Sequence, residues 1–126
     1  MIKLEYFDYD KTTLSVSSEG ENFDIGILSA ASIEFIRAAA LFDRQVEAAK
    51  AQNIPLVDKI EVGEIVIDEP NDQYKLINSH LSKAIVCEWP FDSDIIETLN
   101  DNQALCNAIQ AKAHDLAKEY AKKKTS

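Results

Sequence analysis

The sequence has 126 residues, of which 46% are hydrophobic and 28% are charged, with only three glycines and three prolines. These values exclude a disordered or collagen-like chain, and the length predicts a single domain over residues 1–126. The 13 basic and 22 acidic side chains give a net charge of −9. Such a charge repels phosphate backbones, so nucleic acid is not an expected partner.

Hydropathy and cysteine usage point to a chain that stays in the cytoplasm. No stretch approaches the roughly 20 apolar residues of a membrane span, and residues 1–5 lack the apolar run of a signal peptide. We therefore expect no membrane partner. Cys87 and Cys106 are the two cysteines, and both are expected to be reduced thiols.

Residues 1–28 are predicted to form β-strands. Apolar and polar residues alternate in three runs, with polar turn residues at 10–12 and 18–22 between them. The alternating apolar residues are Ile2, Leu4, Tyr6, Leu14, Val16, Phe23, Ile25 and Ile27. Three short strands make a small meander, which needs another element to cover its apolar face.

Residues 29–53 change to a helical pattern, with Ser29 or Ser32 as the N-cap and Asn53 and Pro55 at the end. The apolar residues that recur at spacings of three to five are Ile33, Ile36, Ala40, Leu41 and Val46. The alanines between residues 38 and 51 allow close approach of another helix or strand. This apolar helix surface exceeds what three short strands can cover, so we expect a homo-oligomer.

Residues 56–69 predict either a short hairpin or an extended arm. The β-branched residues Ile60, Val62, Ile65 and Ile67 alternate across Gly63-Glu64. The acidic neighbours Glu61, Glu64, Asp68, Glu69 and Asp72 lack the ligand spacing and the turn glycine of a calcium loop. A solvated acidic face is therefore expected.

Residues 71–122 are predicted to be helical. Asn71 or Asp72 caps a helix that ends before Trp89-Pro90, and Ser93 caps a short helix. Residues 100–102 break this short helix, and a last helix follows. The chain is thus expected to have an α+β, mainly helical fold, with the small N-terminal meander packed against a C-terminal helical part.

Residues with catalytic or metal-binding chemistry are few and badly spaced. His80, Cys87, Cys106 and His114 show none of the short paired spacings of a zinc site, and no glycine-rich phosphate loop is present. We expect small core cysteines and half-exposed histidines. The sequence therefore predicts no enzyme, no metal, no cofactor and no small-molecule substrate.

Trp89-Pro90-Phe91 is the main aromatic cluster. It is interpreted either as a core anchor that joins two helices, which is the favoured reading, or as an exposed binding patch.

The C-terminal half resembles the tail assembly chaperones of long-tailed bacteriophages. The residues that carry the resemblance are Cys87-Glu88-Trp89-Pro90-Phe91-Asp92, a polar cap at Ser93, Asp94-Ile95-Ile96-Glu97-Thr98-Leu99, Asn100-Asp101-Asn102 and Ala104-Leu105-Cys106-Asn107-Ala108-Ile109. In that family a tryptophan and a following phenylalanine precede a short helix, an Asn-containing break and a last helix. The match covers about 25 of the 126 residues.

The resemblance implies a non-enzymatic role in the host cytoplasm. The protein would keep the tape-measure protein soluble and help to recruit tail-tube subunits onto it. Its candidate interaction or core anchors are Trp89, Phe91, Ile95, Leu99, Leu105 and Ile109. On this reading Ile33, Ile36 and Leu41, together with several of these anchors, divide between the core and a client or self-association face.

One further expectation accompanies the resemblance. Family members are often also made as a longer product by ribosomal slippage, and Lys122-Lys123-Lys124 marks a place where A-rich codons would permit it.

The alternative function is an acidic regulatory or inhibitor protein that occupies a basic site on a nucleic-acid-binding partner, which the charge alone supports.

Overall fold

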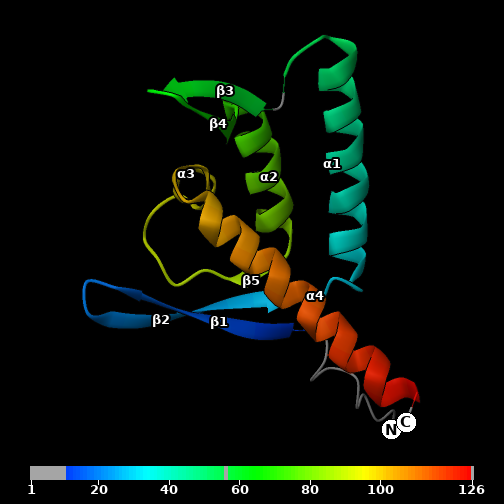
Figure 1. Ribbon diagram of the computed structural model, residues 1–126. Helices are drawn as coiled ribbons and strands as arrows, with labels where there is room; N and C mark the ends of the chain where they lie inside the picture. The colour runs from blue at the N-terminus through cyan, green and yellow to red at the C-terminus, as the bar shows by residue number, and fades with distance from the viewer. Residues whose placement is uncertain (1–10, 56, 126) are drawn as a thin grey trace, which may run out of the picture.

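The computed structural model describes residues 11–55 and 57–125. Its fold is α+β and mainly helical, which confirms the fold class expected from the sequence (Figure 1). The elements of the described residues are β1 (Lys11–Ser18), β2 (Glu21–Leu28), α1 (Ile33–Ala51), β3 (Val57–Val62), β4 (Ile65–Pro70), α2 (Asp72–Ala84), β5 (Val86–Glu88), α3 (Ile95–Asp101) and α4 (Gln103–Thr125).

Strands β1 and β2 form the predicted N-terminal hairpin. They pair antiparallel from Lys11 opposite Leu28 to Ser18 opposite Glu21. The turn residues Glu19 and Gly20 have φ angles of 51° and 81°. Two successive positive φ angles are typical of the two-residue turn that matches strand twist. The strand predicted around residues 2–6 lies outside the described residues.

The third strand of this sheet comes from residues 86–88 and not from the N-terminus. The strand order is β1-β2-β5, and β5 pairs antiparallel with β2. The sequence predicts a second helix that ends before Trp89-Pro90, but α2 ends earlier, at Ala84, and residues 86–88 form a strand that the sequence analysis did not predict. Leu28 N donates to Ile85 O over 2.8 Å. The residue that follows α2 is thus hydrogen-bonded to the end of β2, and the helix does not continue. Tertiary pairing here outweighs the local helical pattern.

The core lies between the sheet and the C-terminal helices. Ile25 and Ile27 are fully buried on one face of β2, while Leu14 and Val16 of β1 are partly buried against the same cluster. Helix α4 crosses this face (Figure 1). The other buried members of the cluster are Ile85, Leu99, Cys106, Ile109 and Ala113.

A polar network joins α2 to α4 beside this core. Asn78 is 4% exposed, and its side chain donates to Gln103 Oε1 over 3.0 Å. Gln110 Nε2 donates to Asn78 Oδ1 over 2.8 Å and to Ser82 Oγ over 3.0 Å. Ser79 Oγ donates to Lys75 O over 2.8 Å. Among the described residues no buried side-chain nitrogen or oxygen lacks a partner, so the network is complete.

The helix caps agree with the predictions at two of three starts. Ser32 Oγ accepts from Phe35 N, and Asn71 Oδ1 accepts from Tyr74 N. At α3 the cap is Asp94 and not Ser93, because Asp94 Oδ2 accepts from Glu97 N. Ser93 Oγ instead accepts a hydrogen bond from the Thr98 hydroxyl. The side chains of both Ser93 and Asp94 therefore stabilise the start of α3.

Candidate interaction surfaces

The six residues that the sequence marked as anchors lie in the core or against it. Leu99 and Ile109 are fully buried, while Trp89, Phe91, Ile95 and Leu105 are partly buried against them. The Trp89 ring lies 5.0 Å from the Phe91 ring, which in turn lies 4.9 Å from Phe23. Trp89 Nε1 donates to Ser93 O over 3.0 Å. This segment therefore acts as an anchor between a strand, β5, and a helix, α3, whereas the sequence suggested a link between two helices.

The four residues with thiol or imidazole chemistry are not brought together. Cys106 is fully buried beside α2, and Cys87 is exposed on β5. His80 and His114 are exposed on α2 and α4. Within residues 11–55 and 57–125, no three His, Cys, Asp or Glu side chains are grouped to hold a metal ion.

Burial also makes the Cys106 thiol unreactive. Desolvation by burial raises the pKa of Cys106, because the thiolate loses its hydration inside the protein. The thiol form is a poor nucleophile. Cys106 is thus a core residue, as the sequence suggested, whereas the same expectation is wrong for Cys87, whose side chain is exposed on β5.

Exposed aliphatic side chains concentrate on two elements. The described residues include nine large hydrophobic side chains with more than two fifths of their surface exposed. Three of these lie in α1, five lie in the β3–β4 hairpin and one lies in α2. They are Ile33, Ile36, Leu41, Val57, Ile60, Val62, Ile65, Val66 and Leu76. Clustering of this kind marks interaction surfaces, whereas scattered exposed residues need no explanation.

Helix α1 packs through one side only. Phe35 contacts the His114 ring at 5.1 Å, and Phe42 contacts the Tyr74 ring at 6.0 Å, so these aromatic residues hold α1 against α4 and α2. Ala49 is the buried residue of the helix. The spacing that identified the helix from sequence therefore belongs largely to its exposed side, where Ile33 and Ile36 are 53% and 54% exposed.

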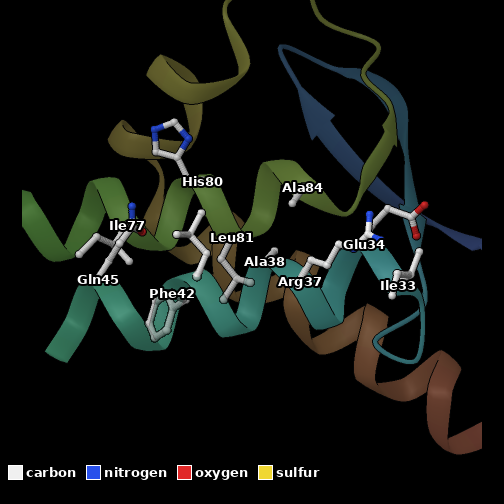
Figure 2. Close-up of a pocket in the computed structure, with 11 residues that line it drawn as sticks. Ile33, Glu34, Arg37, Ala38, Phe42, Gln45, Ile77, His80, Leu81 and Ala84 are labelled. Carbon is white, nitrogen blue, oxygen red and sulfur yellow. The ribbon is translucent and has the colours of Figure 1, made fainter. Parts of the chain in front are cut away.

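An open groove runs between α1 and α2. Its wider part has a volume of about 490 Å³ and continues into a part of about 260 Å³ that shares Gln45, Ile77 and His80 with it. Figure 2 shows the side chains of both helices along the wider part. The apolar residues that line it are Ile33, Ala38, Leu41, Phe42, Ile77, Leu81 and Ala84. Glu34 and Arg37 lie at one end.

The charge of α1 differs from that of the whole chain. Its 19 residues hold three acidic and three basic side chains, whereas the chain has a net charge of −9. Both arginines of the sequence, Arg37 and Arg44, are in α1 and are exposed. Neither forms an ion pair with another of the described residues, while Lys50 and Glu47 pair at 3.7 Å. Helix α1 therefore adds no net charge to the self-repulsion of this acidic protein.

The hairpin of β3 and β4 confirms one of the two predicted forms of residues 56–69. Its register pairs Ile60 with Ile67 and Val62 with Ile65, and Gly63 turns the chain at a φ of 65°. Cross-strand partners share a face, so Ile60, Val62 and Ile65 lie on one face, which we term the hairpin face. Val66 lies on the opposite face. The carboxylates of this segment are exposed, as expected for a solvated acidic surface.

The division between core and exposed residues is the part of the site that sequence reasoning left open. The structure places the C-terminal anchors inward and leaves Ile33, Ile36 and Leu41 outward. A signal was present in the sequence: α1 has apolar residues on two sides, while its aromatic residues, Phe35 and Phe42, lie seven residues apart on one of them.

No helix of the described ranges combines the length and the apolar character that crossing a membrane requires. No protein-family model, curated protein or solved structure matches this chain.

Proposed function

We propose that this protein is a non-enzymatic chaperone of bacteriophage tail assembly, which works in the host cytoplasm and binds an apolar helix of the tape-measure protein. The observation that carries the proposal is the open apolar groove between α1 and α2, with the exposed side chain of Leu41 at its wall. A groove between two helices suits an amphipathic client helix, whose apolar residues recur at every third or fourth position.

The dimensions of the groove support this mode of binding. At 1.5 Å per residue, the 19 residues of α1 give a wall of about 28 Å, which can follow about five turns of a client helix. The apolar residues of the wall exclude water from the client's stripe, which supplies the affinity. The acidic remainder of the chain keeps the complex in solution, because equally charged complexes repel one another.

Recruitment of tail-tube subunits belongs to the same proposal. A client helix in the groove leaves the sheet and the β3–β4 hairpin uncovered, so a second protein can bind while the tape-measure segment is held. The resemblance to tail assembly chaperones supports this order of events, and the two separated groups of exposed aliphatic residues are consistent with it.

The test is co-expression of the chain with a helical segment of the tape-measure protein encoded beside it. Wild type should keep the segment in the soluble fraction, and Leu41→Glu should lose that effect because a carboxylate in the groove costs binding free energy when it is desolvated. Val66→Glu is the matched control, since it makes a similar change at an exposed aliphatic residue outside the groove.

The result also separates this function from the acidic-inhibitor alternative. If both variants keep the segment soluble as well as wild type does, the groove is not the binding site. If wild type fails with the tape-measure segment but binds a basic nucleic-acid-binding protein in a salt-sensitive manner, the proposal is wrong and the alternative is favoured.

A further inference from the structure

We infer that the groove between α1 and α2 preferentially binds an acidic amphipathic helix, in which carboxylates flank the apolar stripe. This inference rests on the proposed function, because it names the chemistry of the client helix that the groove takes. The observation that carries it is the position of the two arginines of the sequence, Arg37 and Arg44, which both lie along the α1 side of the groove.

The two arginines form a basic rim on α1. Arg37 lines the wider part of the groove (Figure 2). Arg44 follows it by seven residues, about two turns, and so lies on the same side of the helix. Leu41, three residues before Arg44, lines the wider part, and Ala48, four residues after it, lines the narrower part. Both guanidinium groups are exposed and can bind a carboxylate without first leaving an ion pair among the described residues.

A second basic rim lies on α2. His80 lines both parts of the groove from this helix. Lys83 follows His80 by three residues, so the two are neighbours on the helix surface, and both are exposed. Lys83 also has no ion-pair partner within residues 11–55 and 57–125. Cationic side chains therefore lie on both sides of the apolar lining, and either flank of a bound helix would meet one.

The carboxylates near the groove lie at its ends or do not line it. Glu34 lies at one end, and no ion pair joins it to the arginine one turn further along α1. Asp72 is in the first turn of α2, at the other end. The other acidic residues of α1, Asp43 and Glu47, do not line the groove, and Glu47 pairs with Lys50 at 3.7 Å. The middle of the groove thus presents cations to a ligand.

The charge of the two helices opposes that of the rest of the chain. Helices α1 and α2 together hold five basic and four acidic residues, a net charge of +1, whereas the rest of the sequence holds eight basic and 18 acidic residues, a net charge of −10. At about 0.15 M salt the screening length is about 8 Å, so the exposed carboxylates of the sheet and the hairpin act weakly at the groove. Local charge therefore favours an acidic ligand, although the net charge of −9 alone would favour a basic one.

Arginine also adds geometry to this recognition. Its planar guanidinium group can donate two parallel hydrogen bonds to one carboxylate, which a lysine cannot do. The Cα atoms of Arg37 and Arg44 are separated by about 10 Å along α1. A client helix that lies along α1 with two carboxylates seven residues apart on one flank would place one carboxylate opposite each arginine. This spacing is the expected recognition feature of the client.

The experiment measures the binding of three synthetic helical peptides to the full chain by isothermal titration calorimetry. Each peptide has about 21 residues, which span about 30 Å, and all share one leucine stripe. The first has glutamates seven residues apart on both flanks, the second has the same glutamates on the side opposite the stripe, and the third has lysines on the flanks. The first should bind about tenfold tighter than the third in about 0.15 M salt, with the second between them, because each exposed ion pair changes Kd by roughly twofold to fivefold. This preference should shrink at about 0.5 M salt.

Two double variants of the protein locate the preference. Arg37→Glu with Arg44→Glu should reverse it, so that the lysine-flanked peptide binds tighter. Lys59→Glu with Lys112→Glu is the matched control, because it makes the same change in net charge at two exposed lysines that do not line the groove. The control should keep the preference of wild type. Circular dichroism of both variants, which change only exposed residues, confirms that they are folded.

Other outcomes overturn the inference. If the three peptides bind wild type equally and Leu41→Glu abolishes their binding, the groove takes apolar helices without selecting their charge, so the inference is wrong while the proposed function stands. If the lysine-flanked peptide binds wild type tightest, the net charge governs binding and the acidic-inhibitor alternative is favoured. If no peptide binds, the proposed function fails as well. In that case, wild type that sediments as multiples of 14.1 kDa, when Leu41→Glu does not, would identify a second copy as the occupant of the groove.

Discussion

The polar network between α2 and α4 predicts a specific loss of stability for Asn78→Ala. This substitution removes two hydrogen bonds, one to Gln103 Oε1 at 3.0 Å and one from Gln110 Nε2 at 2.8 Å. Each neutral bond contributes about 1 kcal/mol net, and alanine returns about 0.5 kcal/mol through its higher helix propensity. The free energy of unfolding should therefore fall by about 1.5 kcal/mol, which lowers Tm by about 6 °C for a chain of this length.

Urea unfolding followed by circular dichroism measures this change, and all proteins are compared at one protein concentration. Asn107→Ala is the matched control: it makes the same substitution at an exposed position of α4, so it should stabilise by the propensity gain of about 0.5 kcal/mol. The two variants should thus differ by about 2 kcal/mol. Equal effects of the two substitutions would show that the network does not stabilise the α2–α4 contact.

Three other predictions concern the close contact at Gly26, the buried Cys106 thiol and the metal content of the protein. Gly26→Ala should destabilise by about 1–3 kcal/mol in urea unfolding, because the added Cβ would lie 2.8 Å from Glu88 Cβ where β5 pairs with β2; a loss below about 0.3 kcal/mol would mean that β5 shifts freely. Burial raises the pKa of the Cys106 thiol, so the folded protein keeps this proton to higher pH than the unfolded chain, and the free energy of unfolding should fall as pH rises above about 8.5. Cys106→Ala should flatten that fall and Cys87→Ala should not, and equal slopes in all three proteins would refute the assignment. Elemental analysis of the purified protein should find no stoichiometric metal, and one zinc per chain that is lost on changing His80 or His114 would contradict the non-enzymatic interpretation.

Local signals were sufficient to predict most elements of the fold. Capping by Ser32 and Asn71, and the alternation on both sides of Gly63, each depend on a few neighbouring residues, and each prediction is confirmed. The strand at residues 86–88 was missed because its reason is non-local. Val86 pairs with Ile27, which lies 59 residues earlier in the chain, and nothing in the local sequence opposes a longer helix.

The interaction surfaces were harder to predict for a related reason. A helix with apolar residues on two sides has two ways to face a core, and the choice depends on what it packs against. In α1 the larger Phe35 and Phe42 rings contact His114 and Tyr74, so the smaller aliphatic residues remain outward. The sequence contained the residues of this surface but not the orientation of the helix.

The exposed aliphatic residues of this chain are distinct from the buried residues that stabilise the fold. The buried cluster of β2, α3 and α4 and the satisfied network beside it contain none of the nine exposed hydrophobic residues. Eight of these residues lie on α1, which supplies Ala49 to the buried residues, or on the β3–β4 hairpin, which supplies none of the buried residues described. Substitutions of these eight exposed residues should therefore leave the free energy of unfolding nearly constant, and any effect that they have should be on binding. Substitution of Leu99 or Ile109 by alanine should have the opposite effect, because each side chain is fully buried and its loss should lower the free energy of unfolding by about 2–5 kcal/mol.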